Sequence, residues 1–198
     1  MSVGGTLDRL DSARDMLANV DARGRPVPTA RFMGGREYQM LTGGAVEEIS
    51  VADIEAVIAN DTCPLPGRLS GVGPFPLGPG GWTGSSPDTD QAKIAGATLY
   101  LALMSDTCLS LVGAGDRVVI EGPFAKNTTY AQLLTALIGC PVHLSTDTTG
   151  TATGAAMLMG YAPPRVLGPP LKPMEIKGLS AFRDRWRKLS AAGSALRK

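Results

Sequence analysis

The residues best suited to chemistry lie in one short stretch, Glu121–Asn127, with the sequence EGPFAKN. Gly122 lets a ligand come close to the backbone, because glycine carries no side chain. Phe124 can stack on a base, Asn127 can form a hydrogen bond to a ribose or a phosphate, and Lys126 can balance negative charge. The stretch contains neither the GxxxxGK[ST] phosphate loop nor the GxGxxG dinucleotide pattern. Taken alone, it is a weak indication of a nucleotide site.

The elements on either side of this stretch predict a β–α–β unit. Residues 117–120 are a β-branched run typical of a buried strand. Asn127 or Thr128 can cap a following helix that ends at Gly139, and a second strand begins at Pro141. A helix N-terminus reached from a strand offers free N–H groups and a positive dipole end to a phosphate. Most such units nevertheless bind nothing at their first turn.

Two further groups of residues could contact a ligand. Residues 146–156, TDTTGTATGAA, combine hydroxyl groups with Gly150 and Gly154, but the same residues can simply cap a helix. Residues 31–37, RFMGGRE, gather two arginines and a glutamate around paired glycines. This group suits either a phosphate or another domain, or else a buried structural ion pair, since charge clusters serve both roles.

Histidine and cysteine usage points away from metal and disulfide chemistry. His143 is the only histidine and lies in a predicted strand, which favours a packing role. Cys63, Cys108 and Cys140 are widely spaced and odd in number, which argues against a disulfide framework and fits a reduced, cytoplasmic setting. No residues have the spacing of a metal site, and no nucleophile–base arrangement is recognisable.

The overall charge excludes a generally basic, nucleic-acid-binding protein, because the formal net charge of the 198 residues is only +1. The C-terminal part, 172–198, does carry eight Lys and Arg against two Asp and Glu. Without interleaved aromatic residues, this pattern favours a solvated helix face with cations near its C-terminus. No apolar run reaches the length of a membrane span, and the N-terminus is unlike a secretory signal. We therefore expect neither nucleic acid nor a membrane as partner.

The rest of the chain predicts mostly helices. In the N-terminal segment, Leu7, Leu10, Ala13 and Leu17 fit one face of a short helix. Residues 27–32 can be extended at a sheet edge because prolines precede and interrupt them. Ser50 and Asp53 form a capping box at the start of a helix. The other predicted elements are a short helix at 36–41, a Pro/Gly loop at 63–88, a long helix at 89–112 capped by Ser86 or Asp88, a small-residue helix at 154–161, an irregular segment at 163–173 and a final helix at 179–192.

Residues 89–162 resemble the C-terminal half of the FGGY carbohydrate kinase family. In that family a long helix precedes a strand that ends in GGGA[KR][NS], then a helix with a QLLAD-like core, a strand that begins with Pro-Val, and a GAA helix. The matching segments here are Gly122–Asn127, Gln132–Ala136, Pro141–Val142 and Gly154–Ala156. Residues 24–38 also resemble a rhamnulokinase-like branch, and residues 65–71 occupy the place of the family's LPYLSGE-type loop.

This resemblance implies a fold and a domain division. The fold would be α/β, a partial ribonuclease H-like domain of the actin/hexokinase ATPase type that lacks its first hairpin. Residues 1–24 would be a peripheral segment, 25–162 the kinase C-terminal-like domain, and 163–198 a crossing segment followed by a C-terminal helix. Because the sheet lacks a hairpin, the resemblance also predicts an exposed sheet edge and self-association.

The same resemblance implies a function. The chain would be the nucleotide-side portion of an ATP- and Mg²⁺-dependent carbohydrate kinase, which phosphorylates a sugar hydroxyl when a missing N-terminal domain complements it. The alternative is a non-catalytic half domain that binds a nucleotide or a partner. The implied cofactor-binding residues are Gly122, Pro123, Phe124, Ala125 and Asn127, with Pro123 and Phe124 standing where the family has glycines.

The resemblance assigns no catalytic residue to this chain, because the family's catalytic aspartate belongs to the other domain. The sugar would likewise be bound through that absent domain. The expected protein partner is an N-terminal kinase half or a second copy of this chain, and the isolated chain is expected to be inactive.

Overall fold

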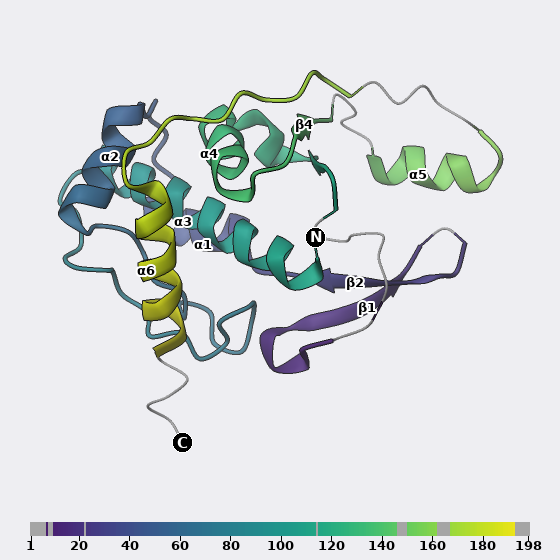
Figure 1. The fold of residues 1–198 in the computed structure, drawn as a ribbon, viewed down its shortest axis with the longest axis horizontal. Helices are drawn as coiled ribbons and strands as arrows, with labels where there is room; N and C mark the ends of the chain where they lie inside the picture. Colours follow the sequence, from purple (N-terminus) through teal and green to yellow (C-terminus); the bar gives the residue numbers. More distant parts are fainter. Residues whose placement is uncertain are drawn as a thin grey trace.

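The chain combines helices with short strands, one pair of them parallel, so the fold belongs to the α/β class, as predicted (Figure 1). The computed structural model describes residues 7, 10–21, 23–113, 115–145, 150–161 and 167–192. The described elements are η1 (Ser12–Arg14), β1 (Met16–Val20), β2 (Pro26–Ala30), α1 (Gly34–Thr42), α2 (Val51–Asn60), α3 (Asp90–Val112), β3 (Val118–Ile120), η2 (Pro123–Lys126), α4 (Thr128–Ile138), β4 (Val142–Leu144), α5 (Gly150–Leu158) and α6 (Leu179–Ala192).

Helix α3 is the centre of the core. Every residue from Ile94 to Leu109 is buried, so the helix has no solvent-facing stripe and its neighbours surround it. Its cap is Thr89, whose hydroxyl accepts the N–H of Ala92 at 3.2 Å, and not Ser86 or Asp88 as the sequence suggested. A Cβ at Gly96 would lie 2.8 Å from the Thr62 carbonyl oxygen, so this small residue allows the segment that follows α2 to approach closely.

By length and composition α3 could cross a membrane, contrary to the expectation that no apolar run is long enough. However, 89% of its most apolar window is buried inside the protein. That burial is typical of the core helix of a folded domain, because a spanning helix would present its apolar residues to lipid.

The described strands form two separate two-stranded sheets. Strands β1 and β2 are antiparallel, with Met16 opposite Ala30 and Val20 opposite Pro26. Strands β3 and β4 are parallel, with Val118 opposite Val142. The predicted strands at 117–120 and from Pro141 are confirmed as β3 and β4, and the extended segment predicted at 27–32 is β2, which ends at Ala30.

The N-terminal helix predicted from Leu7 to Leu17 was wrong, because tertiary contacts override the apolar spacing there. A single turn of 3₁₀ helix ends at Asp15, which adopts a left-handed conformation with φ 57°. The Asp15 carboxylate accepts the Gly73 N–H at 3.0 Å and pairs with Arg31 at 3.1 Å. Strand β1 then places Met16 in a buried cluster with residues of β2 and α3.

Two helices test the predicted boundaries. Helix α2 begins at the predicted capping box, in which Ser50 and Asp53 exchange hydrogen bonds. Helix α5 covers Gly150–Leu158, four residues earlier than predicted at its start, and the chain turns before Tyr161. Alanine and threonine continue the helix N-terminal to Gly154, where we had expected a loop.

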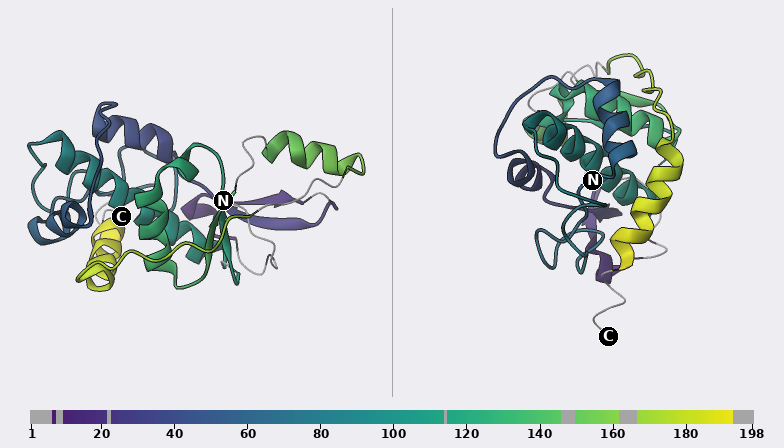
Figure 2. Two further views of the ribbon diagram at one scale, coloured as in Figure 1. Left: turned by 90° about the horizontal axis from the view of Figure 1, so that it is seen from above. Right: turned by 90° about the vertical axis from the view of Figure 1, so that its left-hand side faces the viewer.

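The Pro/Gly segment between α2 and α3 folds back on itself and is not an open loop. Leu65 donates its N–H to the Gly81 carbonyl at 3.0 Å, and Gly80 donates to the Pro66 carbonyl at 2.7 Å. A side chain at Gly67 would lie 2.2 Å from the Gly78 carbonyl oxygen, so the two arms touch through their backbones. The segment is therefore compact and lies beside α3 (Figure 2).

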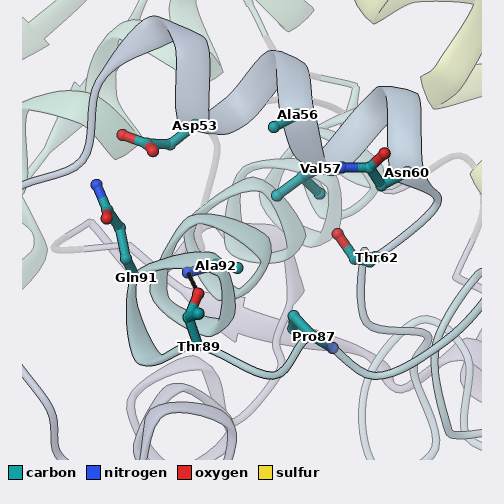
Figure 3. A pocket seen from close by; sticks show the side chains of 9 residues that line it. All are labelled: Asp53, Ala56, Val57, Asn60, Thr62, Pro87, Thr89, Gln91 and Ala92. Carbon is teal, nitrogen blue, oxygen red and sulfur yellow. Dashed lines mark hydrogen bonds between the residues drawn. The ribbon is translucent and has the colours of Figure 1, made fainter.

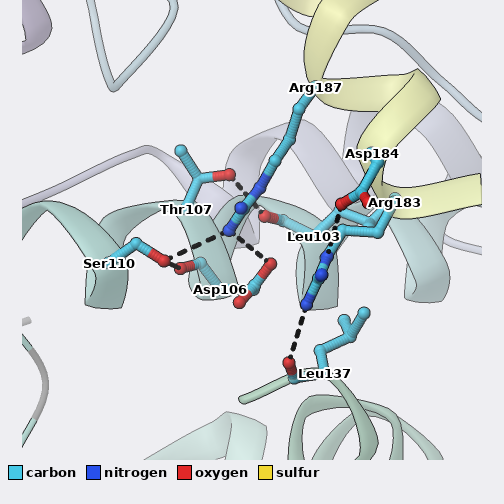
Figure 4. Close-up of polar contacts among 8 residues, drawn as sticks. All are labelled: Leu103, Asp106, Thr107, Ser110, Leu137, Arg183, Asp184 and Arg187. Carbon is cyan, nitrogen blue, oxygen red and sulfur yellow. Dashed lines mark hydrogen bonds and ion pairs between the residues drawn. The ribbon is translucent and has the colours of Figure 1, made fainter. Parts of the chain in front are cut away.

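Three arginines of helix α6 bind it to this body, and Figure 4 shows two of them, Arg183 and Arg187. Arg187 pairs with the buried Asp106 of α3 at 2.7 Å, and Arg183 donates to the carbonyl of Leu137 on α4 at 3.1 Å. Arg185 pairs with Asp61 at the end of α2. The expectation of a merely solvated basic face was therefore wrong for these arginines, because buried and half-exposed acceptors on the body hold them.

Candidate nucleotide site

The predicted site is the turn that connects β3 to α4 (Figure 1). The turn begins at Gly122, whose φ of 74° and ψ of −159° are accessible essentially to glycine alone. The position that a Cβ would occupy at Gly122 has no heavy atom within 4 Å. A ligand can thus approach the backbone at this point, and a side chain there would both strain the turn and fill the space.

Residues 123–126 continue as a turn of 3₁₀ helix that leads directly into α4. The Ala125 N–H donates to the Gly122 carbonyl at 3.0 Å, and Pro123 occupies a first-turn position where its missing N–H costs nothing. Pro123 and Lys126 are exposed, whereas Phe124 and Ala125 are half-buried and pack against the core. The exposed face of the turn consists of backbone, proline and a lysine side chain.

Asn127 is the N-cap of α4, so one of the two predicted capping residues is confirmed. Its Oδ1 accepts the N–H of Tyr130 at 2.9 Å. Its side-chain nitrogen makes no hydrogen bond within the part of the chain that the structure describes. The capping oxygen is therefore committed to the helix, while the amide nitrogen is available as a donor beside the positive end of α4.

Phe124 joins the turn to the core. Its ring packs against Tyr130 with centroids 5.6 Å apart and planes inclined at 51°. The Tyr130 hydroxyl shares a 2.8 Å hydrogen bond with Ser105 of α3, and burial raises the pKa of that phenol. The inward packing of Phe124 leaves Gly122 and Pro123 exposed at the start of the turn.

The structure separates the other candidate residues from this turn. Arg31 pairs with Asp15, and Glu37 is buried and accepts a 2.9 Å hydrogen bond from the Tyr100 hydroxyl. Burial raises the pKa of Glu37, an effect that the Tyr100 hydrogen bond and the nearby Arg68 guanidinium partly offset. Residues 31–37 thus include one buried charged side chain, Glu37. Its hydrogen-bond partner is Tyr100 of α3, and not an arginine of the same segment.

The second loop and the histidine have structural roles where they are described. Residues 146–149 lie outside the described residues, and the rest of that motif forms α5. The Nδ1 atom of His143 lies 2.8 Å from the Gly168 carbonyl, which holds the segment after residue 167 against β4. This contact agrees with the packing role predicted for His143.

Two surface hollows were not predicted from sequence. One, of about 240 Å³, lies between α2 and the start of α3 and is lined by nine residues, among them Asp53, Thr89 and Gln91 (Figure 3). The other, of about 360 Å³, lies between the end of α4 and residues 173–183. Neither includes the turn at Gly122, and within the described residues no three His, Cys, Asp or Glu side chains are grouped to hold a metal.

The solved structures that resemble this chain include several kinases. A carbohydrate kinase from Novosphingobium aromaticivorans is similar over 93% of this chain, with 33% identity and a TM-score of 0.79, although the match covers 41% of that kinase. A xylulose kinase from Rhodospirillum rubrum matches with 21% identity, a TM-score of 0.54 and coverages of 86% and 39%. A Plasmodium falciparum glycerol kinase, solved with ADP, matches with 15% identity, a TM-score of 0.57 and coverages of 92% and 42%.

The last two similarities show the fold alone, and the chain spans about two fifths of the length of each of these kinases. No curated protein sequence matches the chain. Residues 1–166 match the family described as carbohydrate kinase FGGY, C-terminal domain. The chain therefore belongs to the FGGY carbohydrate kinase family and contains its C-terminal, ribonuclease H-like domain.

Proposed function

We propose that this chain is the nucleotide-side portion of an ATP-dependent carbohydrate kinase and that the turn Gly122–Asn127 holds the adenosine of ATP. The observation that carries the proposal is the open, positive-φ Gly122 between a buried strand and a capped helix. A base and ribose can lie against the backbone there, with Gly122, Pro123, Phe124, Ala125 and Asn127 as their contacts. The solved P. falciparum glycerol kinase, with the same fold, was obtained with ADP.

The residues of this chain would bind and orient the nucleotide and would not react. Backbone N–H groups at the start of α4 and the amide nitrogen of Asn127 supply donors, and Lys126 adds a positive charge close by. A Mg²⁺ ion, when bound, would neutralise phosphate charge during phosphoryl transfer. The ion would be held largely by phosphate oxygens and water, with at most one or two carboxylates, since the described residues contain no group of three metal-binding side chains.

The sugar and the phosphoryl-transfer step then depend on a second part of the kinase. Holding the phosphate donor in a fixed position is a large part of catalysis in such reactions, because a positioned donor reacts as if at very high concentration. We assign the chain to a cytoplasmic kinase, complemented by an N-terminal half. The rhamnulokinase-like branch suggested by residues 24–38 remains a proposal about its substrate class.

Calorimetry on the 198-residue chain tests the nucleotide site. ATP, ADP and AMP are expected to bind with similar affinity, since the proposed contacts are to adenosine. Gly122→Val should weaken all three by at least about tenfold, because the side chain fills the contact surface and strains φ.

The matched control is Gly139→Ala, which replaces a glycine with φ 67° and open surroundings at the other end of α4. It also places a side chain at a positive φ, in the left-handed helical region with ψ 11°, and should leave nucleotide affinity unchanged. Absence of heat with all three nucleotides, or equal losses in the two variants, would refute the site.

A further inference from the structure

Tyr130 of α4 is in contact with both the nucleotide turn and the core helix. Its N–H donates to Oδ1 of Asn127, the N-cap of α4, at 2.9 Å. Its ring packs against that of Phe124, with centroids 5.6 Å apart. Its hydroxyl shares a 2.8 Å hydrogen bond with Ser105 of α3. One residue therefore joins the middle and the end of the turn Gly122–Asn127 to α3.

The hydroxyl contact lies in the interior of the protein, where α3 and α4 pack on each other. Tyr130 is 6% exposed and Ser105 is 1% exposed. A hydroxyl at this depth cannot exchange its partner for water, so the loss of one member of the pair leaves the other unsatisfied. The hydrogen bond therefore fixes the position of the Tyr130 ring, and the ring in turn fixes the position of Phe124.

The turn relies on these contacts because its own hydrogen bonds are those of a 3₁₀ helix. Among them, Ala125 donates to the Gly122 carbonyl at 3.0 Å and Asn127 donates to the Phe124 carbonyl at 3.1 Å. Such bonds have poorer geometry than those of an α-helix. Gly122 also adds conformational freedom at the start of the turn. The position of the turn on the core is therefore set by Phe124 and Asn127, and Tyr130 holds both.

We propose that Tyr130, held in place by Ser105, is the positioning residue of the nucleotide turn. Tyr130 does not touch the ligand. It fixes the backbone at Gly122 and the amide of Asn127 in the arrangement that receives adenosine, so that binding does not have to order the turn. Phe124, a stacking candidate by sequence, serves the site through its backbone while its ring anchors the turn to the core. The inference rests on the proposed function, because it concerns the same site.

Two variants of the 198-residue chain remove this hydrogen bond from opposite sides. Ser105→Ala leaves the phenol hydroxyl unsatisfied and displaces the ring, so calorimetry should show ATP binding about tenfold weaker. Tyr130→Phe leaves the Ser105 hydroxyl, which can turn to a carbonyl of its own helix, and should weaken binding only about threefold. Without nucleotide, the amides of Ala125 and Asn127 should exchange hydrogen faster in both variants. Either variant is sufficient if the other does not fold.

The double variant, Ser105→Ala with Tyr130→Phe, tests for rescue. It contains neither hydroxyl, so no polar group is left unsatisfied and the ring can return to its place beside Phe124. It should therefore bind ATP about threefold more tightly than Ser105→Ala alone, and exchange at Ala125 should slow again. Recovery of affinity through a second loss identifies the unsatisfied hydroxyl, and with it the position of the ring, as the cause.

Thr135→Val is the matched control on the same helix. Thr135 is 8% exposed, and its hydroxyl donates to the Ala131 carbonyl of α4 at 2.8 Å, and not to the turn or to α3. This variant should lower the melting temperature but leave ATP affinity and exchange at Ala125 unchanged. Affinity is measured at a temperature where every variant is folded, so a loss of stability alone does not change it.

A second comparison separates an anchoring ring from a stacking ring. Phe124→Leu still packs on Tyr130 but cannot stack on adenine, so it should bind ATP within about twofold of the parent. Phe124→Ala removes the anchor and should weaken binding about tenfold.

Three results would overturn the proposal. One is unchanged exchange at Ala125 in Ser105→Ala. Another is a loss of affinity in Thr135→Val equal to that in Ser105→Ala. The third is an equal loss in Phe124→Leu and Phe124→Ala, which would make the ring a ligand contact.

Failure of the proposed function gives a different result. Absence of heat when nucleotide is added to the parent would refute the adenosine site. Faster exchange at Ala125 in Ser105→Ala, which is measured without nucleotide, would then still support the positioning of the turn by Tyr130.

Discussion

The indole Nε1 of Trp186 donates a 2.8 Å hydrogen bond to the carbonyl oxygen of Pro64, which lies 122 residues earlier in the chain. The Trp186 side chain is fully buried, and its ring meets the edges of Tyr100 and Phe75 at centroid distances of 6.1 and 5.7 Å. This one side chain therefore links α6, the core helix α3 and the folded Pro/Gly segment. Its position explains why a surface helix at the end of the chain is part of the core.

Replacing Trp186 should accordingly destabilise the whole domain and not α6 alone. Trp186→Phe keeps an aromatic ring but leaves the buried Pro64 carbonyl without a donor, at an expected cost of about 1–3 kcal/mol. Trp186→Ala should cost about 3–5 kcal/mol, because it adds a large cavity. Urea unfolding measures both changes. The control is Lys188→Ala, which changes an exposed residue on the same helix. If Trp186→Phe and Lys188→Ala lower the free energy of unfolding equally, Trp186 does not have the linking role described above.

The ion pair between Arg187 and Asp106 should be energetically asymmetric. The Asp106 side chain is 5% exposed, whereas that of Arg187 is 34% exposed. Removing the arginine leaves a carboxylate buried in the core, so Arg187→Ala should cost about 3 kcal/mol. Asp106→Asn should cost less, because the amide oxygen still accepts a hydrogen bond and the guanidinium can remain hydrated.

A double-mutant cycle between these two changes measures the pair. We expect a coupling free energy of about 1–3 kcal/mol from unfolding curves of the parent, both single variants and the double variant. Equal costs for the two single variants would show that burial of the carboxylate does not govern the interaction.

Local sequence signals predicted most of the helices. The features that the sequence did not predict depend on contacts between residues far apart in the chain. The capping box at Ser50 and the apolar run of α3 need only neighbours in sequence, so both were found. By contrast, the predicted N-terminal helix gave way to β1 because Asp15 binds Gly73, 58 residues away. The arginines of α6 resemble a solvated basic face in the sequence, because their partners Asp61 and Asp106 are distant in the chain and reach them only in the folded protein.

The candidate site divides in the same way. The turn at Gly122 and the cap at Asn127 were predicted from adjacent residues, because capping is local. The inward position of Phe124 against Tyr130, and the hydrogen bond from Tyr130 to Ser105, depend on the packing of α4 on α3. No sequence pattern around residue 124 indicates that its ring is already engaged.

Glu37 should make the domain less stable as the pH rises. Burial raises its folded-state pKa above the unfolded value, so the folded protein holds this proton more tightly. The stabilisation is fully present below the unfolded pKa, near 4.3, and is lost as pH rises through the higher folded pKa. The comparison is made between the parent and Glu37→Gln, which keeps an acceptor for the Tyr100 hydroxyl without a charge.

Urea unfolding of both proteins between acid and alkaline pH isolates this residue from the other carboxyl groups. Asp61 and Asp53 have lowered pKa values because of the hydrogen bonds from Arg185 and Ser50, and they contribute the opposite slope in both proteins. As pH rises, the free energy of unfolding of the parent should fall relative to that of Glu37→Gln. A difference that does not vary with pH would show that Glu37 has an ordinary pKa.

Asn127 should serve two separable purposes, the cap of α4 and a contact with the nucleotide. Asn127→Ala removes the cap and should cost about 1 kcal/mol of stability. Asn127→Ser keeps a capping oxygen and should leave stability nearly unchanged, but it removes the amide nitrogen that has no partner in the described structure. Thermal unfolding and ATP calorimetry on the same samples measure the two effects.

The Ser variant decides whether the amide nitrogen contacts the ligand. If it does, Ser and Ala should weaken ATP binding by a similar factor, about five- to tenfold for one lost hydrogen bond, although only Ala lowers the melting temperature. If affinity instead follows stability, so that Ser binds as the parent does and Ala alone binds weakly, Asn127 acts only by holding α4 in place. Hydrogen bonds to the nucleotide would then have to come from the backbone N–H groups of the helix N-terminus, since these are the donors that the turn retains.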